Sequence, residues 1–202
     1  MNILNTRLHE KIETKKALIW DFDGVFCDLD WYYGEDFNDW WKRLGDIFTE
    51  FEKDQKFKSW ENQAFPDEQI NYLIKTYGKK AEEKIDGFFL EKEMLILPHS
   101  KTNAELVKMF SQLDGGLENY VWSNNQRATI DKFLGDNKII DKFRGIVCRG
   151  TEGFMSKPDI TAFKHIRKLT ATPLSDFMFI GDSVLTDKIV AGKLGMDFFL
   201  YG

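Results

Sequence analysis

Short apolar runs alternate along the chain with stretches in which apolar residues recur every three or four positions. The apolar runs cover residues 17–22, 120–123, 145–149, 177–182 and 197–201. Runs of this length, bounded by polar or turn-forming residues, are typical of buried β-strands. The stretches with helical spacing include residues 102–113, 126–134, 158–169 and 187–195. This alternation predicts an α/β fold, a Rossmann-like parallel sheet with helices on both faces.

One segment, residues 28–97, shows helical patterns and no convincing strand. Its clearest stripe consists of Phe37, Trp40, Trp41, Leu44, Phe48 and Phe51. Gly78 stands where a second amphipathic pattern stops, as a helix-ending glycine does. We therefore expect an all-helical domain over residues 28–97, inserted into a core domain made of residues 1–27 and 98–202.

The composition indicates a folded protein without an obvious macromolecular partner. Of 202 residues, 43% are hydrophobic and 30% are charged, and the net charge is −5. A negative net charge disfavours nucleic acid and anionic membrane surfaces as partners. Two cysteines, Cys27 and Cys148, do not indicate a disulfide framework, and no apolar run reaches membrane-spanning length. With no signal-peptide pattern at the N-terminus, we expect a cytoplasmic protein.

Four polar clusters carry the candidate chemistry, and at least three of them directly follow predicted strands. They are "DFDG" at 21–24, "SNN" at 123–125, "SKPD" at 156–159 and "GDSVLTD" at 181–187. In an open parallel sheet, ligands bind beyond the carboxyl ends of the strands. We therefore expect clusters that lie far apart in the sequence to share one crevice.

The predicted crevice is rich in carboxylates. It brings together Asp21, Asp23, Asp182 and Asp187, with one ammonium group on Lys157 and a hydroxyl on Ser123. Carboxylates this close repel one another unless a positive charge lies between them. Oxygen-rich ligand sets suit Mg²⁺, which we predict as the cofactor. Gly24 would let the backbone turn sharply after the strand.

In this order, the four clusters resemble the four motifs of the haloacid dehalogenase-like (HAD) superfamily. The similarity covers residues 17–26 and about 97–201, and it leaves the helical insertion unmatched. "KPD" and "FIGDSVLTDKIVAGKLGM" are its most specific stretches. The resemblance implies an Mg²⁺-dependent phosphohydrolase that acts on a small phosphorylated metabolite. It also implies that the insertion is a cap that closes over the site.

The resemblance implies a covalent mechanism with two aspartates. Asp21 would be the nucleophile and would form an aspartyl phosphate. Asp23 would protonate the leaving oxygen and then activate water.

It further implies how the phosphate and the metal are held. Ser123 and Asn124, with nearby N–H groups, would bind phosphate oxygens, because Ser123 falls just before a helix expected to begin near Gln126. Lys157 would neutralise charge on the phosphate and on Asp21. Asp182 would bind Mg²⁺ together with a carboxylate oxygen of Asp21 and the backbone carbonyl of Asp23. Asp187 would orient Lys157 or a metal-bound water.

Several alternatives stay open. A phosphosugar mutase shares all four clusters, and a non-catalytic module that binds a phosphorylated ligand is a further alternative. A dehalogenase is disfavoured because that branch lacks the second aspartate, which is Asp23 here. Trp31, Tyr32 and Tyr33 either face the substrate or pack in the cap. The substrate and the oligomeric state have no signature in the sequence.

Overall fold

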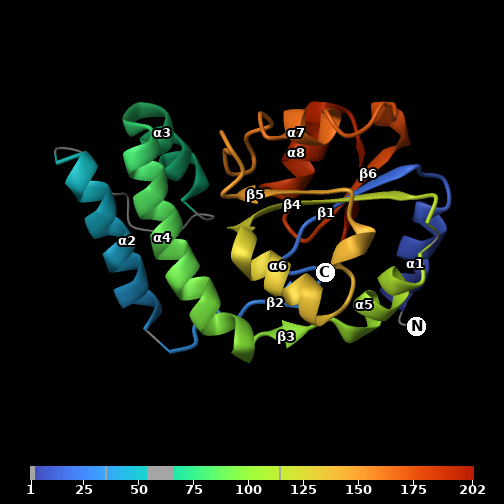
Figure 1. The fold of residues 1–202 in the computed structure, drawn as a ribbon, viewed down its shortest axis with the longest axis horizontal. Helices are drawn as coiled ribbons and strands as arrows, with labels where there is room; N and C mark the ends of the chain where they lie inside the picture. Colours follow the sequence, from blue (N-terminus) through green and yellow to red (C-terminus); the bar gives the residue numbers. More distant parts are fainter. Residues whose placement is uncertain (1–2, 35, 54–65, 114) are drawn as a thin grey trace.

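A five-stranded sheet forms the centre of the computed structural model, which describes residues 3–34, 36–53, 66–113 and 115–202. From edge to edge, the strands are β5 (Gly145–Arg149), β4 (Glu118–Gln126), β1 (Ala17–Trp20), β6 (Phe177–Gly181) and β7 (Asp197–Leu200). Every neighbouring pair is parallel (Figure 1). The predicted strands and the α/β fold are therefore confirmed.

The register of the three central strands decides where the polar clusters lie. Trp20, the last residue of β1, is opposite Val121 of β4 and Ile180 of β6. The three strands therefore reach the same level of the sheet, and Asp21 is the first residue after β1. Ser123 and Asp182 each follow two residues beyond this level, so polar groups from three chain segments converge at the carboxyl edge.

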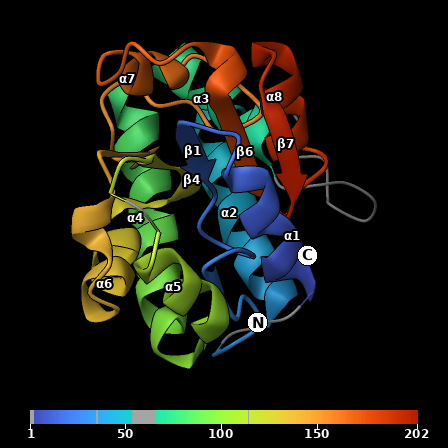
Figure 2. The same cartoon turned by 90° about the vertical axis from the view of Figure 1, so that its right-hand side faces the viewer.

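Helices cover both faces of the sheet (Figures 1 and 2). On the face that carries Leu18 and Trp20, the helices are α1 (Ile3–Ile12), α5 (Ala104–Ser111) and α6 (Arg127–Asp136). On the face that carries Ala17 and Ile19, they are α7 (Phe163–Arg167) and α8 (Asp187–Leu194). All four β1 residues are fully buried, because alternate side chains of a central strand enter the two hydrophobic cores.

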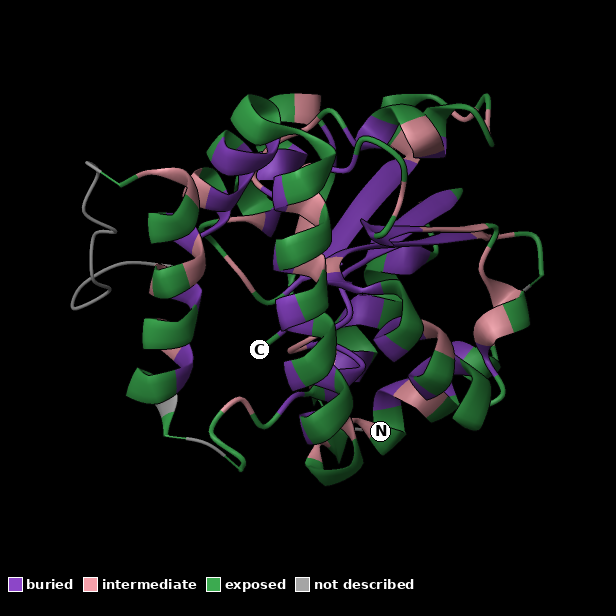
Figure 3. Cartoon of the chain, turned by 60° about the vertical axis from the view of Figure 1, so that its left-hand side comes forward, coloured by how far each residue is buried: buried purple, intermediate pink, exposed green. Residues whose placement is uncertain are grey.

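The described part of the insertion is mainly helical. Its helices are α2 (Phe37–Phe51), α3 (Asp67–Tyr77) and α4 (Lys79–Ile96), and they pack around their own apolar cluster, which includes Trp40, Leu73 and Ile85. In Figure 3 the buried part of α2 is a stripe on the side turned toward α4. The predicted stripe of α2 faces this cluster through Trp40, Leu44 and Phe48.

Two short strands join the insertion to the rest of the chain. β2 (Cys27–Asp28) and β3 (Lys101–Thr102) pair antiparallel, so the two connections run side by side. Short 3₁₀ helices occupy Leu97–His99, Ile140–Lys142 and Leu174–Asp176. In the described part of the chain, no helix combines the length and the apolar character that a membrane crossing requires.

The structure corrects two of the predicted elements. The helix expected over 158–169 begins only at Phe163, because the Asp159 carboxylate accepts hydrogen bonds from Thr161 and holds a turn there. The strand expected over 120–123 continues to Gln126, and α6 begins at Arg127. Ser123 therefore lies within a strand and not directly before a helix.

Candidate active site

A cavity of about 530 Å³ opens at the carboxyl edge of the sheet, between the strand ends and helices α3 and α4. The predicted residues that line it are Asp21, Asp23, Gly24, Ser123, Asn124, Lys157 and Asp182. The remaining one, Asp187, lies behind Lys157 and is fully buried. The structure thus brings together every site residue that the sequence indicated.

Lys157 lies between two buried carboxylates. Its Nζ atom is 2.9 Å from Asp21 Oδ2 and 2.5 Å from Asp187 Oδ1. Burial alone would lower the pKa of Lys157, but the charges of Asp187 and Asp21 outweigh it and raise that pKa. Lys157 therefore remains a cation beside Asp21.

Asp21 is held from two sides. Its Oδ1 atom accepts a hydrogen bond of 2.8 Å from the Phe22 amide, and its Oδ2 atom faces Lys157. The Asp21 amide donates to the Ile180 carbonyl of β6, which continues the sheet by one residue. The carboxylate is thus anchored on the rigid strand edge.

Asp23 has a different environment, although it is only two residues away. Its Oδ1 atom accepts from the Leu29 amide at 2.9 Å, and its Oδ2 atom accepts from Trp31 Nε1 at 2.7 Å. Burial raises the pKa of Asp23 to about 7, against the lowering effect of these two hydrogen bonds, while Asp21 and Asp182 raise it further. A carboxyl group with this pKa can both give and take a proton near neutral pH.

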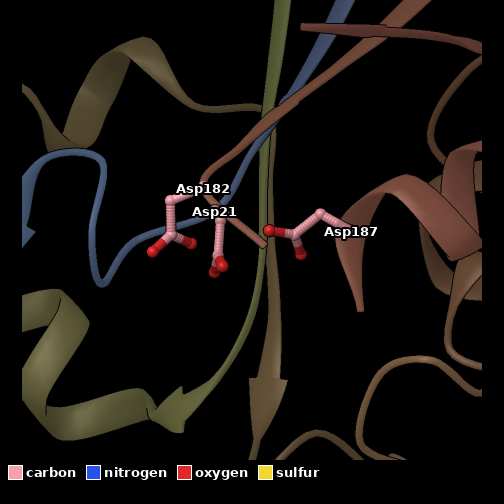
Figure 4. Close-up of side chains that lie close together, drawn as sticks. All are labelled: Asp21, Asp182 and Asp187. Carbon is pink, nitrogen blue, oxygen red and sulfur yellow. The ribbon is translucent and has the colours of Figure 1, made fainter. Parts of the chain in front are cut away.

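Three carboxylates form a group that fits a divalent cation. Asp21, Asp182 and Asp187 each offer an oxygen, and these oxygens lie within 4.8 Å of one another. Figure 4 shows Asp187 reaching toward the other two from the start of α8. Burial, and then the charge of Asp21, raise the pKa of Asp182 to about 6, although the charge of Lys157 lowers it in part, so the charged form of Asp182 would be stabilised by a further positive charge. A hard cation with oxygen ligands would supply one.

The amide side chain of Asn124 is bonded to the main chain of Lys157. Asn124 Oδ1 accepts from the Lys157 amide at 2.8 Å, and Asn124 Nδ2 donates to the Lys157 carbonyl at 3.2 Å. Ser123 is fully buried and donates its hydroxyl hydrogen to Asn125 Oδ1 at 2.8 Å. Asn124 therefore fixes the backbone that carries Lys157.

The helix amide that we expected to be free for an anion is already occupied. The Gln126 amide, at the start of α6, donates to Glu93 Oε2 of α4 at 2.8 Å. Gln126 Nε2 also donates to the Asp86 carbonyl of α4. These bonds connect the helical insertion to the end of β4.

The sequence does not mark three further polar residues that line the cavity, two from the insertion and one from the end of β5. They are Asp67, Glu93 and Arg149, and all three are buried. Arg149 Nη2 donates to Ser156 Oγ at 2.8 Å and lies 3.4 Å from Asp67 Oδ1, while its guanidinium covers the ring of Phe89. No motif marks them, because two of the three stand on amphipathic helices of the insertion, where charged residues are common.

The side chains of the three aromatic residues after β2 lie in different environments. Trp31 lines the cavity. Tyr32 is 72% exposed, and Tyr33 stacks on His99 with ring centroids 3.6 Å apart. Neither tyrosine is among the described residues that line the cavity.

Known proteins resemble this chain in sequence and in fold. A curated relative, the drimenol cyclase drtB of Aspergillus calidoustus, is 32% identical over 130 residues, which are 64% of this chain but only 24% of that protein. The crystal structure of a candidate phosphoglycolate phosphatase from Lactobacillus plantarum has a TM-score of 0.58 at 17% identity, covering 93% of this chain and 86% of that one. The magnesium-bound candidate HAD-hydrolase YfnB of Bacillus subtilis has a TM-score of 0.54 at 20% identity, covering 91% and 87%.

The sequence itself matches the haloacid dehalogenase-like hydrolases over residues 18–201. This span contains all four polar clusters and the inserted helices. The chain therefore belongs to the haloacid dehalogenase-like hydrolase family.

Proposed function

We propose that this chain is an Mg²⁺-dependent phosphatase that hydrolyses a small phosphorylated metabolite through an aspartyl-phosphate intermediate. The observation that carries the proposal is the contrast between Asp21 and Asp23 in one cavity. Asp21 faces the cation of Lys157 at 2.9 Å, whereas burial raises the pKa of Asp23 to about 7. One carboxylate is suited to attack, and the other to transfer a proton.

In the first step, an oxygen of Asp21 forms a bond to phosphorus while the bond between phosphorus and the ester oxygen breaks. Asp23 gives its proton to that ester oxygen, and the alcohol leaves. In the second step, Asp23 takes a proton from water, and the water oxygen attacks phosphorus. The bond from phosphorus to Asp21 then breaks, which releases phosphate and restores both aspartates.

Lys157 supports both steps by offsetting negative charge. Its ammonium group is fixed between Asp21 and Asp187, so it needs no rearrangement when charge develops on the transferred phosphoryl group. Asn124 holds the Lys157 backbone in place from the neighbouring strand. Phosphoryl transfer depends mainly on such positioning and charge neutralisation.

Asp21, Asp182 and the backbone carbonyl of Asp23 would hold Mg²⁺, with Asp187 close enough to support a metal-bound water. When bound, the ion would neutralise the acidic group and polarise a phosphoryl oxygen. Gly24 supports this assignment, because a side chain there would occupy the space of the Asp182 carboxylate. The YfnB structure, which is bound to magnesium, supports it by analogy.

We propose that residues 28–97 act as a cap domain on a core of residues 1–27 and 98–202. Asp67 of α3 and Phe89 and Glu93 of α4 form part of the cavity wall, so the insertion contacts whatever fills it. A wall of this kind excludes bulk water from the leaving-group side. A volume of about 530 Å³ is suited to a small molecule.

The test is phosphate release from a broad panel of phosphorylated metabolites with Mg²⁺. Asp21→Asn serves as the blank, and Asp136→Asn, an aspartate at the exposed end of α6, serves as the matched control. We expect release by the wild type and by Asp136→Asn, and none by Asp21→Asn. Isomerisation of a sugar phosphate without release of phosphate would instead indicate the mutase. No turnover of any panel member would contradict the proposal.

A further inference from the structure

We propose that Trp31 is a positioning residue that makes protonation of the leaving group depend on the packing of the helical insertion. Trp31 would act through Asp23, by fixing the direction of its carboxyl group. The inference rests on the proposed role of Asp23 as the general acid.

Both donors that hold Asp23 come from one short segment. The Leu29 amide binds Oδ1 at 2.9 Å, and the Trp31 indole binds Oδ2 at 2.7 Å. One hydrogen bond would leave the carboxyl group free to turn about its Cβ–Cγ bond, but two bonds to different oxygens fix that rotation. An indole N–H can only donate, so its bond persists whether or not Asp23 carries a proton.

The segment that carries these donors leads directly from β2 toward the helical insertion. The Trp31 amide donates to the Leu29 carbonyl at 2.9 Å, which closes a tight turn between the two donors. A shift of this turn would therefore move both donors together. Since the Leu29 bond comes from the main chain, Trp31 supplies the bond that depends on a side chain.

Trp31 also packs against two hydrophobic clusters at once. One is the core on the Leu18 face of the sheet, and the other is the cluster inside the helical insertion. Its ring lies 5.7 Å from the ring of Trp40 on α2, which in turn lies 5.0 Å from Phe88 on α4. Displacement of the insertion from the sheet would therefore move the Trp31 indole and alter its hydrogen bond to Asp23.

These contacts predict a defect that depends on the leaving group. Trp31→Phe keeps an aromatic ring in place but removes the N–H group. An alkyl alcohol needs a proton as it leaves, whereas p-nitrophenolate does not. General acid catalysis contributes about 10²–10⁴-fold, so we expect Trp31→Phe to lower kcat/KM for an alkyl phosphate by roughly 10–100-fold. For p-nitrophenyl phosphate we expect a change below about threefold.

The measurement compares kcat/KM for the two substrates on the same protein sample. Their ratio does not depend on how much of the variant is folded, because the concentration of active enzyme cancels. Trp122→Phe is the matched control, since Trp122 is a buried indole in the core on the Ala17 face of the sheet and is not bonded to Asp23, and it should leave the ratio unchanged. The double variant Trp31→Phe/Asp23→Asn should have the same ratio as Asp23→Asn alone, because Trp31 acts only through Asp23.

Two outcomes would overturn the inference. Equal losses for both substrates in Trp31→Phe, which leave the ratio unchanged, would show that the residue only packs. No loss for either substrate would show that the indole bond has no role. Asp23→Asn separates these results from a failure of the proposed function. If Asp23→Asn lowers the ratio but Trp31→Phe does not, only the role of Trp31 is wrong. If Asp23→Asn itself does not lower the ratio, Asp23 is not the acid, and both proposals fail.

Discussion

Gly24 and the carboxylate of Asp182 lie so close together that a Cβ atom at position 24 would overlap the Asp182 side chain. Gly24 also has φ +75°, a conformation that residues with a side chain rarely adopt. The turn after β1 thus brings the backbone directly against a proposed metal ligand. Any side chain at position 24 would have to displace that ligand.

We therefore expect Gly24→Ala to impair metal binding more than folding. The positive φ costs roughly 1–2 kcal/mol in stability, but the overlap acts directly on Asp182. Titration of activity with Mg²⁺ should show a loss of at least about tenfold in apparent metal affinity, while the melting temperature falls by only a few degrees. Gly87→Ala is the control, because a Cβ at that position on α4 meets no atom within 4 Å. An unchanged Mg²⁺ titration for Gly24→Ala would contradict the assignment of Asp182.

Removal of divalent cations should abolish activity. Three carboxylates with oxygens within 4.8 Å of one another, and Lys157 as their cation, need a further positive charge to bind a phosphorylated substrate. Activity measured after chelation should return with Mg²⁺ but not with Ca²⁺, whose larger and looser coordination would misplace Asp21. Turnover that survives thorough chelation would refute the metal site.

Glu93 should make the stability of the protein depend on pH. Burial raises the pKa of Glu93 from its ordinary 4.5 to about 7, although the Gln126 amide lowers it in part. Between these values the folded protein keeps a proton that the unfolded chain releases, so the free energy of unfolding falls as pH rises. Relative to Glu93→Gln, the wild type should lose up to about 3 kcal/mol between pH 4.5 and pH 8.

Urea denaturation of both proteins across this pH range measures the effect. The difference in unfolding free energy between wild type and Glu93→Gln should shrink or reverse sign toward high pH. A difference that stays constant, or that grows in favour of the wild type, would show that Glu93 is ionised in the folded protein at all these pH values.

The charge of the cavity should select substrates with uncharged leaving groups. Among the described residues that line it, the carboxyl groups belong to Asp21, Asp23, Asp28, Asp67, Glu93 and Asp182, and the cations are Lys157 and Arg149. Arg149 already faces Asp67 and Ser156. We expect kcat/KM for glycerol phosphate to exceed that for phosphoglycerate by about tenfold or more, since like charges repel strongly in a confined site.

Asp67→Asn should reduce the preference for glycerol phosphate over phosphoglycerate. It removes the charge that faces Arg149, so the guanidinium becomes able to attract an anionic leaving group. Measured side by side, the two substrates should differ less in Asp67→Asn than in the wild type. If the wild type already hydrolyses the carboxylate-bearing substrate equally well, the charge argument is wrong.

The fold could be predicted because its signals are local. β1 is a short apolar run, and its two buried faces require the centre of a parallel sheet. The failures have local causes as well. The helix expected from Pro158 was lost to a side-chain turn at Asp159, and periodicity carries no information about such competition.

Site residues that stand in a sequence motif could be predicted. Residues that only a contact with a distant segment distinguishes could not. Asp21, Lys157 and Asp182 follow strands or stand in recognisable clusters. Glu93 looks like any charged residue of an amphipathic helix, and only its contact with the Gln126 amide, across 33 residues, distinguishes it. The sequence marks Trp31 only as one of three neighbouring aromatic residues, and its bond to Asp23 depends on a turn that the sequence does not specify.

The central claim is that Asp21 attacks phosphorus and Asp23 transfers protons. The most direct test measures intact protein mass after a rapid acid quench, with an activated aryl phosphate as substrate. Asp23→Asn keeps the nucleophile but slows hydrolysis of the intermediate by about 10²–10⁴-fold, so the aspartyl phosphate should accumulate. We expect one added phosphoryl group on Asp23→Asn and none on Asp21→Asn. A phosphoryl group on Asp21→Asn, or one that peptide mapping locates on Asp23, would show that the two roles are reversed or that the mechanism is different.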